Sequence, residues 1–70
     1  MIPLFTAVFL VFMAGGGEKV ATVRAKQALP EEACWEFVKQ QTPVVEAFVS
    51  ANKGFPVFAI GACVPEERRT

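Results

Sequence analysis

The segment that most constrains the fold is an amphipathic stretch covering residues 30–52. On a helix of about 100° per residue, one set of mostly apolar positions lies within about 60° of a common direction. This stripe contains Cys34, Phe37, Val38, Gln41, Val45, Phe48, Val49 and Asn52. The stripe keeps its phase through Pro43, so we predict one helix, kinked at Thr42-Pro43, that stops at Gly54. The alternative is a break, with Thr42 capping a second helix.

The segments on either side of this helix have the residue types of strands. Residues 19–25 alternate modestly, whereas residues 55–64 are mainly β-branched, aromatic or small. Alternation places Val57, Ala59, Gly61 and Cys63 on one face of the second strand and Phe58, Ile60, Ala62 and Val64 on the other. Both faces are apolar, which predicts a strand buried on both sides. We therefore predict an α+β fold whose body, residues 18–65, is a βαβ-like strand, kinked helix and strand with the strands parallel through a right-handed crossover.

Two cysteines link the predicted helix to the second strand. The helix rises about 27 Å from Cys34 to its end, and the strand returns about 26 Å before it reaches Cys63. The two sulfur atoms therefore come level, and we predict one intrachain disulfide rather than two buried free thiols. In the chain-entropy model a bridge closing a loop of about 30 residues stabilises the fold by roughly 3.6 kcal/mol.

The predicted bridge also bears on location. Disulfides persist in oxidising compartments. The sequence therefore favours the cell envelope, another extracytoplasmic setting or a virion exterior over the cytoplasm.

The first 17 residues form an apolar head and a glycine joint. Thr6 is the one polar side chain among residues 1–14, and Gly15, Gly16 and Gly17 follow as a flexible joint or a tight turn. The head has three interpretations. It could be a secretory signal cleaved at the small residues. It could anchor the chain in a membrane or an assembly, although 14–17 helical residues reach about 21–26 Å against an apolar core of about 30 Å. It could also be a buried extra strand, because its phenylalanines and valines favour strands.

The composition excludes most chemistry. The 70 residues contain no His, Asp or Tyr, so neither a catalytic triad nor a four-ligand zinc site can form within one chain. The net charge is zero, which argues against binding nucleic acid through phosphate neutralisation. We therefore expect no enzymatic activity, no cofactor, no metal, no small-molecule substrate and no nucleic-acid partner.

These observations predict a non-enzymatic structural or accessory subunit. It would dock through its head and its apolar surfaces into a larger assembly of protein partners, in a membrane complex or a virion, with residues 1–14 as a membrane contact. The candidate contact residues are Phe5, Phe9, Phe12, Trp35 and Val44. The alternative is a secreted, disulfide-stabilised binding module with a cleaved signal peptide. With its apolar head, short strand, Cys-bearing helix and terminal Ala-Cys-Val-Pro, the chain is similar in layout alone to many small bacterial and phage envelope or virion proteins. Residues 66–70 are expected to form a charged tail.

Overall fold

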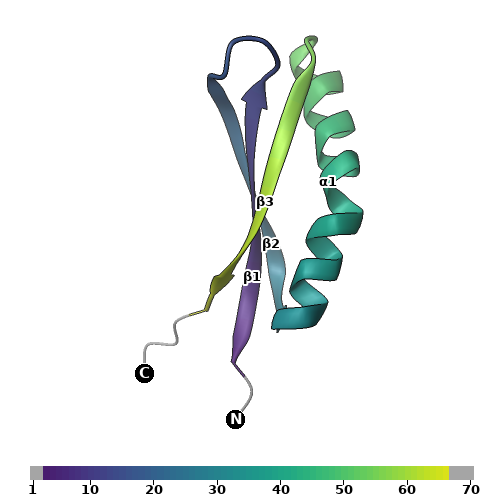
Figure 1. The fold of residues 1–70 in the computed structure, drawn as a ribbon. Helices are drawn as coiled ribbons and strands as arrows, with labels where there is room; N and C mark the ends of the chain where they lie inside the picture. Colours follow the sequence, from purple (N-terminus) through teal and green to yellow (C-terminus); the bar gives the residue numbers. More distant parts are fainter. Residues whose placement is uncertain (1–2, 67–70) are drawn as a thin grey trace.

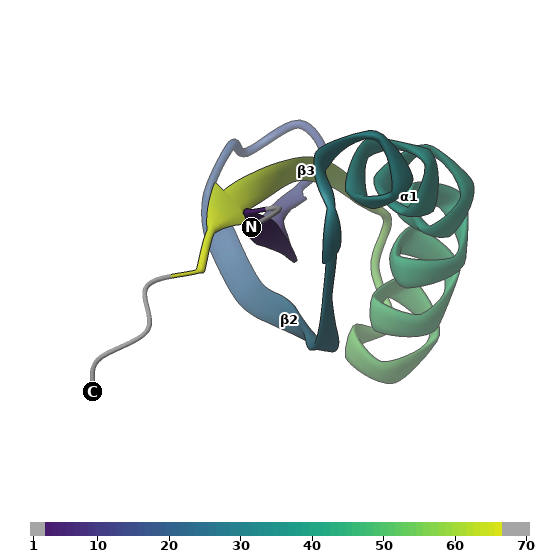
Figure 2. The ribbon, with the colours of Figure 1, turned by 90° about the horizontal axis from the view of Figure 1, so that it is seen from below.

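The computed structural model describes residues 3–66, which form three strands and one helix. In chain order these elements are β1 (Leu4–Met13), β2 (Lys19–Pro30), α1 (Glu31–Lys53) and β3 (Val57–Pro65). The strands make one antiparallel sheet in the order β2-β1-β3. The helix lies across one face of this sheet (Figures 1 and 2). The predicted α+β class is therefore confirmed, while the charged tail beyond Glu66 lies outside the described residues.

The two body strands are parallel, as predicted, but they are not neighbours in the sheet. β2 and β3 do run in the same direction, but β1 lies between them and pairs antiparallel with both. The physical reason is that a short turn joins β1 to β2, and a tight turn produces antiparallel neighbours. The β2-α1-β3 unit is thus a split βαβ unit with the apolar head inserted in its centre.

The glycine run makes the turn of this hairpin. Gly15 and Gly17 have φ values of 87° and 71°, a left-handed region that suits glycine. The Gly17 N–H donates to the Met13 carbonyl at 3.0 Å, and the Met13 N–H donates to the Glu18 carbonyl at 2.8 Å. Of the three interpretations of the head, the structure has the extra strand. Among the described residues, no helix combines the length and the apolar character that a bilayer crossing requires.

The helix is continuous through Pro43, which confirms one helix rather than two. It begins directly after Pro30 without a side-chain cap, and Glu31 and Glu32 place negative charge at its positive end instead. At its other end Gly54 adopts a left-handed conformation, with its N–H donating to the Ser50 carbonyl at 2.8 Å. The kink at Pro43 stays a prediction.

The core lies between α1 and the sheet face beneath it, which we call the covered face. The buried side chains are Ala7, Phe9, Val11, Cys34, Val38 and Val49. Phe9 is 2% exposed, and its ring lies 6.4 Å from the ring of Phe37. Gly61 allows the helix to approach β3, because a Cβ there would collide with Val38 and press on the Phe9 ring. No polar side chain is buried among the described residues, so this core is held by apolar packing and the disulfide.

The side of the helix that contacts the sheet changes along its length. In the first half, Cys34, Phe37 and Val38 face the sheet, as the stripe predicts. In the second half the inward side shifts, so that Val49 is buried while Phe48 is 67% exposed. Because the sheet is twisted, a long helix that crosses it turns successive flanks toward it. Phe48, although it belongs to the predicted apolar stripe, therefore does not face the core.

Candidate functional site

The candidate site is the sheet face opposite α1, which we call the open face. Side chains alternate along a strand, so the neighbours of the buried β1 residues point away from the helix. Register places Leu10 beside Ile60 and Phe12 beside Phe58 on this face. Its apolar members are Val8, Leu10 and Phe12 of β1 and Phe58, Ile60 and Val64 of β3. Among the described residues no helix or strand covers it (Figure 2).

The middle of the open face is an exposed apolar strip. Ile60 is 53% exposed and Leu10 is 36% exposed. The rings of Phe12 and Phe58 stack with centroids 5.4 Å apart at one end of the strip. The sequence predicted that β3 would be buried on both sides, and this is wrong for the single chain. The pattern of alternation was correct, but one helix can cover only one face.

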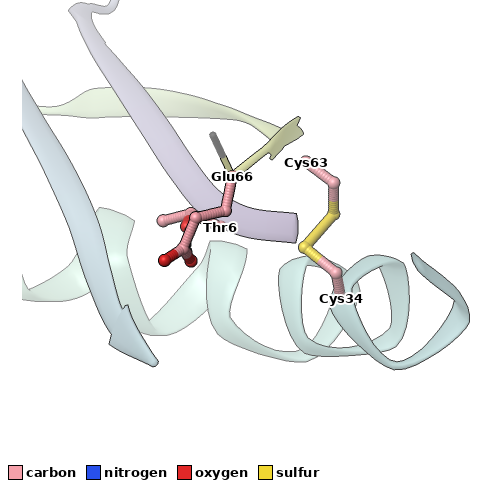
Figure 3. The surroundings of a disulfide bond; sticks show 4 residues. All are labelled: Thr6, Cys34, Cys63 and Glu66. Carbon is pink, nitrogen blue, oxygen red and sulfur yellow. Dashed lines mark hydrogen bonds between the residues drawn. A yellow bond between two sulfur atoms is a disulfide. The ribbon is translucent and has the colours of Figure 1, made fainter. Parts of the chain in front are cut away.

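One end of the open face is polar and hollowed. An open depression of about 730 Å³ there is lined by Thr6, Arg24, Ala25, Lys26, Val64, Pro65 and Glu66. Arg24 and Lys26 are exposed on β2, and Glu66 follows β3. The Thr6 hydroxyl donates to the Glu66 carboxylate at 3.4 Å, and Figure 3 shows the two side chains facing each other. The open face is therefore apolar along its centre, basic along β2 and acidic at the end of β3.

Both edges of the sheet are modified in ways that hinder strand addition. On β3, the Ala59 N–H donates to a Glu46 carboxylate oxygen at 2.8 Å, so this donor is taken by the helix. On β2, the register against β1 shifts between Thr6 and Val8 and again between Val11 and Phe12. Irregular and occupied edges disfavour pairing with another strand. Both edges are therefore poorly suited to the addition of a further strand.

The disulfide joins Cys34, near the start of α1, to Cys63, near the end of β3, and this confirms the predicted pairing. The two Cα atoms are 6.1 Å apart, and Figure 3 shows the bridge spanning from the helix to the strand. Cys34 is fully buried, so the bridge belongs to the core. A disulfide of this kind indicates an oxidising, extracytoplasmic setting.

The five candidate contact residues are spread over different parts of the molecule. Phe9 lies in the core, and Phe5 packs against it. Phe12 lies on the open face, stacked on Phe58. Trp35 and Val44 are exposed on α1, where Trp35 lines a small hollow. Only Phe12 therefore belongs to the candidate site.

Sequence reasoning missed most of the open face. Leu10, Ile60 and Val64 were not among the candidates, and neither were the basic residues Arg24 and Lys26. The signal that could have found them is the apolar character of both sides of β3. A chain with a single helix can bury only one face of its sheet, so the other apolar side must stay exposed in the monomer. No cluster of three or more His, Cys, Asp or Glu side chains suited to a metal occurs among the residues that the structure describes.

Comparisons with known proteins give no indication of the function of this chain. No protein-family model matches this chain, and no curated protein and no solved structure matches it either.

Proposed function

We propose that this protein is a non-enzymatic accessory subunit that docks through the open face into a larger extracytoplasmic assembly. The observation that carries the proposal is the exposed apolar strip centred on Leu10 and Ile60. Large exposed apolar patches on small proteins mark interaction surfaces more often than accidents of sequence. The polar rim formed by Arg24, Lys26 and Glu66 would give such a contact its orientation.

The docking surface is the open face rather than the head as a separate arm. β1 pairs with β2 on one side and with β3 on the other, so its backbone is already used by the sheet. Its buried side chains Ala7, Phe9 and Val11 are used by the core. What β1 contributes to a partner is its other set of side chains, Val8, Leu10 and Phe12.

The disulfide supports a place in the cell envelope or on a virion exterior, where a bridge formed once is kept. The sequence supports a role without catalysis, since it contains no His, Asp or Tyr. A secreted module with a cleaved signal is the competing proposal. Cleavage after residue 16 would remove the strand that holds β2 and β3 together, so the structure favours retention of the head.

The test is to follow the protein in its native source by size fractionation. We expect the chain to elute with a large assembly, and Ile60→Asp to release it as a small folded species. Phe48→Asp is the matched control, because Phe48 is an equally large, exposed apolar residue on the helix. A chain that elutes alone, or one released equally by both substitutions, would contradict the proposed docking surface.

A further inference from the structure

We infer that the open face binds a membrane surface that contains anionic phospholipid. The inference rests on the proposed function, because it names the partner of the same surface. The apolar strip would enter the boundary between headgroups and acyl chains, and the basic side chains of β2 would lie beside the lipid phosphates. The helix α1 would face the water.

The net charge of zero conceals a separation of charge between the two layers of the fold. β2 carries Lys19, Arg24 and Lys26 and no carboxylate, and neither β1 nor β3 contains a charged side chain. α1 carries four carboxylates against two lysines. The sheet layer is therefore basic and the helix layer acidic, which favours a negatively charged partner for the sheet side.

Two cations lie beside the apolar strip. Arg24 pairs with Val8, whose side chain belongs to the open face, and Lys26 lines the depression at the end of that face. Both side chains are exposed. Lys19 is offset by its neighbour Glu18 in the turn, so Arg24 and Lys26 provide the net positive charge of this surface. Cations beside exposed apolar side chains match a lipid interface, which offers phosphates and acyl chains together.

The contact is centred on the half of the open face that lies nearest the turn between β1 and β2. Here Phe12 stacks on Phe58, and Leu10 and Ile60 are exposed next to them. Glu66 lies beyond the opposite end of the strip, so its negative charge is far from the side chains that would enter the lipid. The apolar end of the face can therefore approach an anionic surface without bringing this carboxylate against it.

A fluid partner suits the shape of this face. Figure 1 shows the strands crossing one another in projection, so the sheet is twisted and the open face is not flat. A rigid flat surface would touch such a face over a small area. Headgroups and acyl chains instead rearrange around side chains that lie at different heights, to a depth of about 5–10 Å.

The experiment is co-sedimentation of the oxidised, full-length chain with vesicles of phosphatidylcholine that contain phosphatidylglycerol. Vesicles of phosphatidylcholine alone are the comparison. We expect half-maximal binding at about 0.1–1 mM accessible lipid, close to the reversible affinity of a single acyl chain. Binding should weaken at least about tenfold without the anionic lipid, and it should fall as added salt screens the charges.

A substitution in the strip tests the apolar part of the contact. Ile60→Asp should weaken vesicle binding at least about tenfold, because it removes an apolar side chain from the contact and adds a negative charge. Phe48→Asp adds the same charge at an exposed apolar position on the helix and should change binding less than about threefold. Circular dichroism and the intact disulfide show that each variant is folded. Equal losses in the two variants would overturn the inference.

A charge reversal tests the basic part of the contact. Arg24→Glu with Lys26→Glu should weaken binding to the anionic vesicles at least about 30-fold. Lys39→Glu with Lys53→Glu produces the same net charge on the helix and should weaken binding less than about threefold. Equal effects would show that net charge rather than the basic strand governs binding, and this would overturn the proposed orientation.

Tryptophan fluorescence tests the orientation independently. The chain has a single tryptophan, so in a Trp35→Phe background Phe58→Trp places the only indole on the open face and Phe48→Trp places it on the helix. Lipids with brominated acyl chains should quench the first and leave the second unquenched. Quenching of the helix position alone would overturn the inference.

Two outcomes separate this inference from the proposed function. A chain that does not bind the anionic vesicles at about 5 mM lipid overturns the lipid surface. The accessory-subunit proposal still stands if that chain stays in its native assembly after detergent extraction and Ile60→Asp releases it, which points to a protein partner. Conversely, a chain that binds the vesicles as described but elutes alone from its native source supports the lipid surface and contradicts the accessory-subunit proposal.

Discussion

The two faces of this sheet are built from the same strands and are both apolar along β1 and β3, yet they differ in burial. Along β1, Phe9 and Val11 are buried under the helix, while their neighbour Leu10 is exposed. Along β3, Cys63 is bonded to the helix while Ile60 is half exposed. The difference indicates that an apolar face of a sheet is a face that another element or molecule buries. Whether the same chain or another molecule supplies the cover depends on how many helices the chain contains.

The covered face should carry most of the folding stability. Phe9→Ala removes a ring that is 2% exposed and leaves a cavity beneath α1, so we expect a loss of about 3–5 kcal/mol. The matched substitution on the open face, Phe58→Ala, should cost about 1 kcal/mol, chiefly from the lost stacking on Phe12. Urea unfolding at low protein concentration measures the loss for Phe58→Ala and shows whether Phe9→Ala still has a folded baseline. Equal losses would remove the distinction between the faces.

The bridge is the next largest contribution to the covered side. Cys63→Ala should cost about 2–5 kcal/mol, the usual loss when a small domain loses its disulfide. A domain of this size has about 3–5 kcal/mol in total, so the variant should be largely unfolded in the absence of a partner. Thermal unfolding followed by circular dichroism reports this. A variant with an unchanged midpoint would show that apolar packing alone holds α1 on β3.

The close approach of α1 to β3 at Gly61 should give a smaller loss of stability, and the adjacent position on the open face offers a direct comparison. Gly61→Ala places a methyl group against Val38 and the Phe9 ring, and we expect a loss of about 1–3 kcal/mol from overpacking. Ala62→Val adds volume one residue further along, on the open face, and should change stability by less than about 0.5 kcal/mol. Denaturant midpoints of the two variants compare the faces at adjacent positions. Tolerance of Gly61→Ala would mean that the helix packs more loosely than the structure shows.

The sequence was sufficient for the helix, the disulfide and the faces of β3. These follow from local periodicity and from the matched lengths of helix and strand that bring Cys34 level with Cys63. The sequence was not sufficient for the strand order, because the apolar character of residues 4–13 is compatible with a membrane anchor, a signal peptide or a strand. Two features favour the central position of β1. The short glycine turn makes β1 an antiparallel neighbour of β2, and β3 needs a strand to pair with.

The site was harder to predict for a related reason. Large apolar residues such as Phe5, Phe9, Trp35 and Val44 are natural candidates for contacts, but burial depends on which element lies above each residue. Phe9 lies under the helix and Ile60 does not, although both belong to apolar strands. Sequence alternation separates the faces without saying which one the helix will take.

The helix's outward flank should contribute least to stability. Phe48→Ala removes a ring that is 67% exposed, and we expect a change within about 0.5 kcal/mol, in contrast to Phe9→Ala. Chemical denaturation of the monomer checks this. A loss of several kcal/mol would mean that the helix is rotated toward the stripe predicted from the sequence.

The most direct measurement is the intact mass of the native protein under non-reducing conditions. β1 is the strand shared by both faces, so the protein that folds and docks as described must keep residues 4–13. We expect a mass that includes this strand and is lower than the reduced mass by two hydrogen atoms, because Cys34 and Cys63 are bridged. A mature chain that lacks its first 16 residues would contradict the central strand, and with it both the core and the open face.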